Sequence, residues 1–140
     1  MIVVDTIVIA SLWAPNDMDE LAYQVLRKDP DWVAPLLWRS ELRNVLALYL
    51  RKNILELTTV LLSMQEAEQL MESNAYQVNS TQVLHLVHNS ICSSYDFCSS
   101  YDCEFVALAD DLDIKLVSFD KQTCREFSEI AVHPEKFVKN

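Results

Sequence analysis

The chain has 140 residues, of which 51% are apolar and 23% are charged, and its 21 Asp and Glu residues against 11 Lys and Arg residues give a net charge of −10. This length and composition are typical of one globular domain, which we expect to span residues 1–140. The chain contains no glycine, which excludes the glycine-rich phosphate-binding loops of dinucleotide and P-loop enzymes. The acidic balance argues against binding of nucleic acid through a broad basic face, because phosphate contacts dominate such binding.

The amino-terminal segment and the cysteines indicate the cellular compartment. No stretch approaches the roughly 20 apolar residues of a membrane span, and Asp5 stands where a signal peptide would carry basic residues. We therefore expect a cytoplasmic protein with no membrane partner. The four cysteines lack the paired spacing of a zinc site, so we interpret them as thiols in a reducing compartment.

Apolar patterning in the first half of the chain predicts alternating strands and helices. A continuous apolar run is expected of a strand buried in a parallel sheet, whereas apolar residues three and four apart indicate a helix packed on one side. In chain order, these patterns predict a strand over Ile2–Val4, a helix from Leu21 to Asp29, a short strand over Trp32–Ala34, a helix from about residue 35 to Lys52, and a helix from Thr58 or Thr59 to Asn74.

The second half continues this alternation. Its predicted elements are a short strand over Ala75–Val78, a helix that starts at Thr81, a helix capped by Ser99 or Ser100, a strand over Ile114–Val117, a short helix over Lys121–Phe127, and an edge strand over Ile130–Val132. Strands separated by helices imply βαβ crossovers. The sequence therefore predicts an α/β fold with a mainly parallel sheet and helices on both faces.

Two acidic residues follow predicted strands. Asp5 ends the first strand, and Asp120 follows the strand over Ile114–Val117. In an open α/β sheet, ligands bind beyond the carboxyl ends of the strands, so both side chains can open onto one edge. The alternative for each is a turn or helix-cap role, because Asp is favoured in both positions.

Two further acids stand near the start of predicted helices. Glu41 lies in the first turns of the helix that begins near residue 35, and Asp102 opens the helix capped by Ser99 or Ser100. The helix dipole favours a carboxylate at either position, whether the side chain faces solvent or a cleft. Both residues can therefore be ordinary helix-start acids or members of one site with Asp5 and Asp120.

Carboxylates that converge without basic partners repel one another, which raises their pKa values and costs stability. A divalent cation resolves this conflict, and Mg²⁺ suits such a site because it prefers carboxylate oxygens and retains several waters. A cation of this kind activates water and binds a phosphoryl oxygen. Such a site would hydrolyse a phosphodiester without a protein nucleophile.

Four segments carry these acids in a set order. They are Asp5-Thr6 after an apolar strand, Ser40-Glu41-Leu42-Arg43-Asn44-Val45-Leu46 on a helix, Tyr101-Asp102-Cys103-Glu104-Phe105-Val106-Ala107-Leu108-Ala109, and Leu116-Val117-Ser118-Phe119-Asp120. In these segments the chain resembles the PIN domain family over almost its whole length. The resemblance implies a Rossmann-like three-layer α/β/α sandwich and a Mg²⁺- or Mn²⁺-dependent ribonuclease site. Small single-domain members are commonly VapC-type toxins that pair with an antitoxin and often form homodimers.

The resemblance also implies roles for individual residues. The acids that match the catalytic and metal-binding positions are Asp5, Glu41, Asp102 and Asp120. Ser118 stands where the family often has threonine, and it retains the hydroxyl. Thr6 and Asn44 match positions that support the site by hydrogen bonding, with turn or helix-surface roles as the alternative.

Two cations lie on the same predicted helix as Glu41. Arg39 and Arg43 are four residues apart, and they are the candidates for binding RNA phosphates. The alternative is a solvated charged face, which is a common role for surface cations.

A local duplication interrupts the resemblance. The segment Cys92-Ser93-Ser94-Tyr95-Asp96-Phe97 is followed by Cys98-Ser99-Ser100-Tyr101-Asp102-Cys103. We assign the third acid to Asp102 rather than Asp96, because the helix that follows Asp102 sets the direction of its side chain. The six inserted residues are expected to form a loop, since extending the helix would rotate the upstream connection by some 240°.

The sequence predicts a metal-dependent endoribonuclease that uses water as the nucleophile and is the toxin of a type II toxin–antitoxin pair. The alternative is a catalytically weak or inactive PIN-like module that binds nucleic acid or acts as a scaffold. The position of Asp102 relative to Asp5 distinguishes the two, because the insertion could have displaced this acid from the site.

Overall fold

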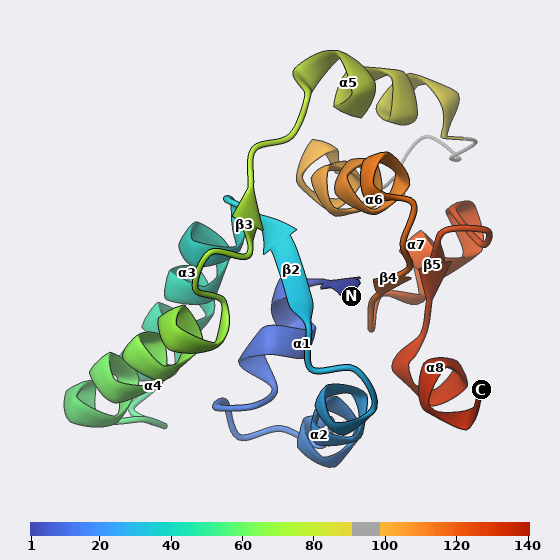
Figure 1. Cartoon of the computed structure of the whole chain (residues 1–140). Coiled ribbons are helices and arrows are strands. Elements are labelled where there is room, and N and C mark those ends of the chain that lie inside the picture. The colour runs from blue at the N-terminus through green and yellow to red at the C-terminus, as the bar shows by residue number, and fades with distance from the viewer. Residues whose placement is uncertain (91–98) are drawn as a thin grey trace.

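The computed structural model describes residues 1–90 and 99–140. Its centre is a sheet in the order β3-β2-β1-β4-β5, and each neighbouring pair of strands is parallel (Figure 1). The strands are β1 (Ile2–Val4), β2 (Trp32–Pro35), β3 (Ala75–Tyr76), β4 (Leu116–Val117) and β5 (Ala131–Val132). The predicted α/β fold with a parallel sheet is confirmed.

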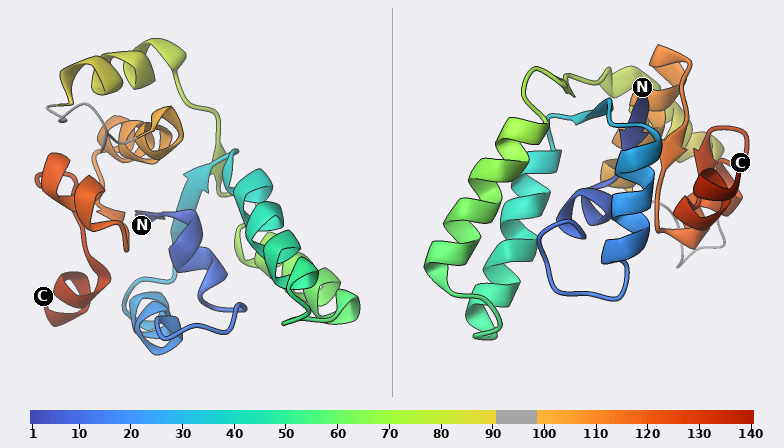
Figure 2. Two further views of the ribbon diagram at one scale, coloured as in Figure 1. Left: turned by 180° about the vertical axis from the view of Figure 1, so that it is seen from behind. Right: turned by 60° about the horizontal axis from the view of Figure 1, so that its bottom comes forward.

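Helices cover both faces of this sheet. In the described part of the chain they are α1 (Thr6–Ala10), α2 (Asp19–Lys28), α3 (Trp38–Arg51), α4 (Leu57–Leu70), α5 (Ser80–Asn89), α6 (Ser100–Leu112), α7 (Lys121–Glu126) and α8 (Pro134–Lys139). Helices α5 and α6 lie on one side of the sheet, and α1, α2 and α8 lie on the other, while α3 and α4 pack as a pair beside it (Figures 1 and 2). The three-layer α/β/α sandwich is therefore confirmed.

Strand β1 is central because its residues are apolar on both faces. Val3 and Val4 are fully buried, and Ile2 is nearly so. Val3 pairs with Val33 of β2 on one side and with Leu116 of β4 on the other. Asp5, the residue after β1, is therefore held at the carboxyl edge of the sheet, between the ends of its two neighbours.

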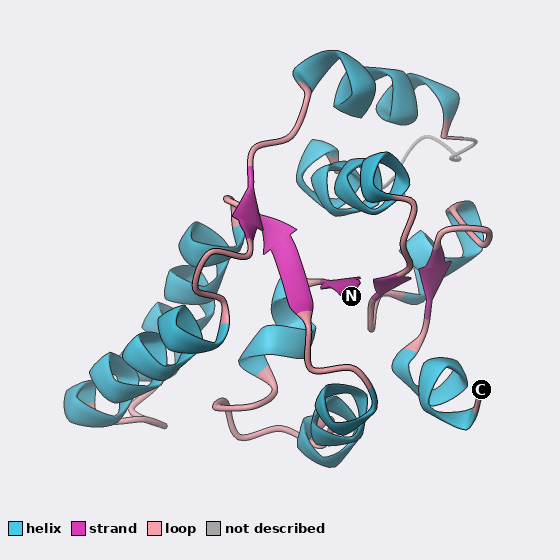
Figure 3. Ribbon diagram, viewed as in Figure 1, coloured by secondary structure: helices cyan, strands magenta, loops and turns pink. Residues whose placement is uncertain are grey.

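The structure contains two short helices, α1 and α8, that the sequence patterns did not predict (Figure 3). Helix α1 follows β1 directly and consists largely of apolar, β-branched residues, which favour strands by their intrinsic propensity. It forms a helix because the Asp5 carboxylate accepts a hydrogen bond from the backbone N of Val8 at 2.9 Å. Helix α8 begins at Pro134, and His133 caps it by accepting from Glu135 N at 3.3 Å.

The lack of glycine has a structural consequence at three chain reversals. Asn53, Ser73 and Asp113 have φ values of 55°, 64° and 55°, in the left-handed region that favours glycine. Each lies just beyond the carboxyl end of a helix, respectively α3, α4 and α6. Asn and Asp tolerate this region better than other residues with a side chain, so small polar residues take the place of glycine at these helix ends.

The first copy of the duplicated segment lies outside the described residues, and so do Asp96 and the expected loop. The second copy begins α6, where Ser99 is the helix cap, as predicted. No helix in residues 1–90 and 99–140 combines the length and the apolar character that crossing a membrane requires.

Helix α3 offers a matched test of the core. Leu42 is 1% exposed within the core and Leu48 is 48% exposed on the same helix. We expect Leu42→Ala to lower the free energy of unfolding by about 2–5 kcal/mol, because it removes buried methyl groups and leaves a cavity. Leu48→Ala should change it by less than about 0.5 kcal/mol. Urea denaturation of both variants measures the difference, and equal losses would contradict the packing of α3.

Candidate active site

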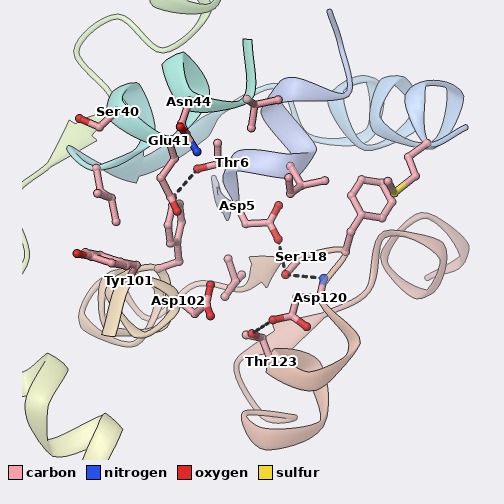
Figure 4. A pocket seen from close by; sticks show the side chains of 17 residues that line it. Asp5, Thr6, Ser40, Glu41, Asn44, Tyr101, Asp102, Ser118, Asp120 and Thr123 are labelled. Carbon is pink, nitrogen blue, oxygen red and sulfur yellow. Dashed lines mark hydrogen bonds between the residues drawn. The ribbon is translucent and has the colours of Figure 1, made fainter. Parts of the chain in front are cut away.

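A pocket of about 870 Å³ opens at the carboxyl edge of β1 and β4. Four acids from four different elements line it: Asp5 after β1, Glu41 of α3, Asp102 of α6 and Asp120 after β4 (Figure 4). No Lys, Arg or His side chain is among the described residues that line this pocket. We call it the acidic pocket.

Asp5 occupies the centre of the site. Besides capping α1, its carboxylate accepts a hydrogen bond from the hydroxyl of Ser118. The pKa of Asp5 is raised to about 6, chiefly by burial and in small part by the nearby charge of Asp120, while the hydrogen bonds from Ser118, Val8 and Phe119 lower it. A carboxylate with little access to water is held here by donors that favour its charged form.

Ser118 connects the ends of β4 and β1. Its side chain is buried, donates to Asp5 and accepts from the backbone N of Asp120 at 3.0 Å. The predicted supporting role of this hydroxyl is therefore matched by a direct contact with Asp5. One hydroxyl fixes the separation between the two strand-end acids.

Asp120 caps α7 as well as lining the pocket. Its two carboxylate oxygens accept from Gln122 N at 3.0 Å and from the Thr123 hydroxyl at 2.7 Å. Asp120 therefore has both of the roles that the sequence suggested: it caps α7, and it lines the pocket at the end of β4. Thr123 is a site residue that the sequence reasoning missed, although a hydroxyl three residues after a capping Asp is a recognisable signal.

Glu41 faces the pocket from α3. Its carboxylate accepts a hydrogen bond from the Thr6 hydroxyl at 2.8 Å. Burial raises the pKa of Glu41, and the Asp102 charge raises it further, while the Thr6 hydrogen bond lowers it. The pKa of Glu104, one turn from the pocket rim, is also raised by burial and by the charge of Glu41.

Asp102 lines the same pocket as Asp5, so the duplication does not remove it from the site. It also forms a capping box with Ser99: its carboxylate accepts from the Ser99 N and hydroxyl at 3.1 and 3.0 Å, and its own N donates to the Ser99 hydroxyl at 3.1 Å. This cap fixes the start of α6 at the pocket.

The remaining predicted residues divide between the rim and the surface. Asn44 lines the pocket, together with Ser40. Arg43 is exposed and donates to the Ser40 hydroxyl at 3.1 Å, which places it beside the rim. Arg39 lies over the ring of its neighbour Trp38, 5.7 Å from the ring centre, and it does not line the pocket.

The donor set of the acidic pocket suits a hard divalent cation, because it consists of carboxylate, hydroxyl and amide oxygens. The charge of Asp120 raises the pKa of Asp5, and the charge of Asp102 raises the pKa of Glu41. A bound cation would neutralise this repulsion between carboxylates. Among the described residues, no three His, Cys, Asp or Glu side chains converge closely enough to hold a metal ion. Each acid is instead bound to a helix cap or a hydroxyl.

The fold and this pocket define an α/β protein with a carboxylate site at the ends of its parallel strands. The chain belongs to the PIN domain family, which its sequence matches over residues 2–132. PIN domains are in general nucleases, and PIN nucleases typically use divalent metal ions.

Two solved structures have the same fold as this chain. One is FitAB bound to the IR36 DNA fragment, with 17% identity, a TM-score of 0.70, and coverage of 96% of this chain and 95% of that one. The other is FitAcB from Neisseria gonorrhoeae, with 17% identity, a TM-score of 0.71, and coverage of 96% and 99%. No curated protein matches the chain.

The raised pKa of Asp5 predicts a pH-dependent stability. The folded protein binds a proton at Asp5 more tightly than the unfolded chain does. Protonated Asp5 therefore stabilises the fold at low pH, and this stabilisation is lost as the pH rises from about 4 to about 6. In EDTA, we expect Asp5→Asn to be more stable than wild type above pH 6, by up to about 3 kcal/mol, and equal to it below pH 4.

Urea denaturation between pH 3.5 and 8 measures this difference. Asp111→Asn is the control, because Asp111 is an exposed acid of α6 that does not line the acidic pocket. A pH profile of Asp5→Asn that runs parallel to that of wild type would show that the Asp5 charge is not costly in the folded protein.

Proposed function

We propose that this protein is a metal-dependent endoribonuclease that hydrolyses RNA phosphodiester bonds with water, and that it is the toxin of a type II toxin–antitoxin pair. The observation that carries the proposal is the acidic pocket, which four carboxylates from four elements line with no basic side chain among its described lining residues. Isolated carboxylates in such a place cost stability. A site for Mg²⁺ or Mn²⁺ would account for their presence in one pocket.

Asp5, Glu41, Asp102 and Asp120 would hold the cation. When bound, it would supply charge neutralisation at the phosphate and activation of the attacking water. Ser118 keeps Asp5 in place at the end of β1, and Thr6 does the same for Glu41. Asn44, on the pocket wall, is in position to support the acids or to contact substrate.

Hydrolysis by water fits the residues that surround these acids. The described pocket lining contains hydroxyl groups, but no His or Lys that could activate one of them as a nucleophile. Arg43, which is anchored beside the rim by Ser40, is the better candidate of the two arginines for binding an RNA phosphate. Arg39 would contribute only if the RNA extended beyond the pocket to Trp38.

The VapC-type resemblance and one exposed apolar surface support an antitoxin partner and a homodimer. Helix α4 exposes Leu57, Leu61 and Leu62, and an antitoxin segment or a second copy would cover apolar side chains of this kind. We propose an antitoxin partner, a homodimer, a cytoplasmic location and a single domain over residues 1–140.

One observation favours the alternative, a catalytically weak or inactive PIN-like module that binds nucleic acid or acts as a scaffold. Asp102 is engaged in the capping box of α6, and binding of a cation would have to compete with Ser99 for its carboxylate. If Ser99 kept the Asp102 carboxylate and the cation did not bind, the protein would still bind RNA but would not cleave it.

The central test is cleavage of RNA in Mg²⁺ or Mn²⁺. We expect Ser118→Ala to lower the rate by about 10–100-fold, as is typical when the partner of a metal ligand is lost. Asp5→Asn, which removes a ligand, should lower it by more, and EDTA should abolish cleavage. Asp111→Asn should cleave at the wild-type rate.

Cleavage that survives both EDTA and Asp5→Asn would overturn the proposed mechanism. Binding of RNA without cleavage in either metal would favour the alternative module. Both results can be obtained from one labelled RNA, by gel electrophoresis for cleavage and by fluorescence anisotropy for binding.

Cation binding itself is testable without activity. A metal that binds only the folded protein stabilises it by about 1.4 kcal/mol at ten times its dissociation constant. We expect MgCl₂ or MnCl₂ to raise the melting temperature of wild type and Asp111→Asn above that in NaCl of equal ionic strength. Asp120→Asn should lose this rise, and an unchanged rise would exclude Asp120 as a ligand.

A further inference from the structure

Two further hollows lie beside the acidic pocket. The first, of about 700 Å³, is formed by the start of α2, by α7 and by the start of α8. It shares Met18 and Phe119 with the acidic pocket. The second, of about 460 Å³, lies beyond it near β5 and α8, and shares Cys124, His133 and Lys136 with the first. We call them the near hollow and the far hollow.

The three concavities therefore form a series. The acidic pocket lies at the ends of β1 and β4, and His133, the first residue after β5, marks the junction of the two hollows. Strands β4 and β5 are neighbours in the sheet, so the series leads outward from the acidic pocket to the edge strand β5. The far hollow reaches past β5, because Lys115 and Ser128 line it from positions that precede β4 and β5. Helices α7 and α8 flank this edge on the same side of the molecule (Figure 1).

The hollows carry the opposite charge from the pocket. They gather five of the chain's eleven Lys and Arg side chains: Lys28, Lys115, Lys121, Arg125 and Lys136. The near hollow also contains Asp17 and Glu135, whereas no acidic side chain is among the described residues lining the far hollow. A chain with a net charge of −10 thus has a basic surface next to the acidic pocket.

These cations are available to bind an anion. Within residues 1–90 and 99–140, Lys121, Arg125 and Lys136 form no ion pair, although acids outnumber bases in the chain. Lys28 and Lys115 donate to the backbone oxygens of Phe137 and Glu129. Each ammonium has three donors, so these two lysines keep capacity for a phosphate.

Aromatic rings mark both junctions of the series. Phe119 lines the acidic pocket and the near hollow, and His133 lines both hollows. Their rings meet edge to face, with 5.6 Å between centres and 79° between planes. Cationic grooves with aromatic side chains at intervals bind single-stranded nucleic acid, because phosphates follow the charge and bases stack on the rings.

We propose that the near and far hollows bind the phosphates of a single-stranded nucleic acid on one side of the bond to be cut. This inference rests on the proposed function, since it places that bond at the acidic pocket. The continuity with the acidic pocket favours a nucleic-acid strand over an acidic protein segment. This path leads from the acidic pocket toward β5 and α8.

The test compares two matched pairs of substitutions. Arg125→Gln with Lys136→Gln removes one Arg and one Lys from the hollows, while Arg51→Gln with Lys52→Gln removes the same residue types from the exposed end of α3. Both pairs leave the net charge at −12, two below that of the wild-type chain. Neither pair alters a residue of the acidic pocket.

Binding is measured first, by fluorescence anisotropy with a labelled single-stranded RNA of about 12 nucleotides at several salt concentrations, in an Asp5→Asn background. Each phosphate contact contributes about 0.7 to the salt slope for single strands. The hollow pair should lower the slope by about 1.4 and weaken binding by about tenfold at low salt. The α3 pair should change neither.

Cleavage then tests the direction of the strand, with substrates lengthened on one side of the cut only. Wild type should show a larger fall in KM when the side that reaches the hollows is lengthened than when the other side is. The variant with Arg125→Gln and Lys136→Gln should lose this fall in KM. Its kcat and its cleavage of a trinucleotide should equal those of wild type. Equal behaviour of the two pairs in both assays would overturn the inference, and this is also the result expected if the hollows bind an acidic protein segment.

Failure of the proposed function gives a different result. A protein that cleaves no RNA, but whose salt slope falls only in the hollow pair, still binds nucleic acid in the hollows. If both double variants cleave RNA as well as wild type does, the protein has the proposed activity but does not bind the strand in the hollows.

Discussion

The hydrogen bond from the Ser118 hydroxyl to the Asp5 carboxylate joins the ends of two neighbouring parallel strands. Ser118 also accepts from the backbone N of Asp120, so one buried side chain sets the positions of both strand-end acids. Glu41 and Asp102 reach the same pocket because α3 packs on α1 and α6 packs on β1 and β2. The site thus depends on β1 lying between β2 and β4 at the centre of the sheet.

Charge is separated between the acidic pocket and the hollows beside it rather than spread evenly. The acidic pocket has no cation among its described lining residues, and the hollows beyond Phe119 gather nearly half of the basic side chains. The net charge of −10 therefore does not describe the surface that a substrate would meet. The proposed cation would bind in the acidic pocket and the proposed strand along the hollows, so the two would use side chains of opposite charge.

Most of the fold could be predicted from local patterns, because the strands are continuous apolar runs and the longer helices have one apolar face. Helix α1 could not, since its β-branched sequence favours a strand, whereas the Asp5 cap and the packing against α3 favour a helix. The acids of the site were predictable from their places after strands and at helix starts. Arg39 was placed near substrate by spacing alone, but in the structure it lies over Trp38, outside the pocket.

The sequence by itself determined the parallel α/β fold, the family and the four acids, since all of these depend on residue order and local periodicity. Only the tertiary structure decided that these acids share one pocket without a basic side chain among its described lining. It also revealed the Thr123 contact and the basic path past Phe119. The physical reason is that Coulombic repulsion and hydrogen bonding depend on distance in space, and residues such as Asp5 and Ser118 lie 113 positions apart in the chain.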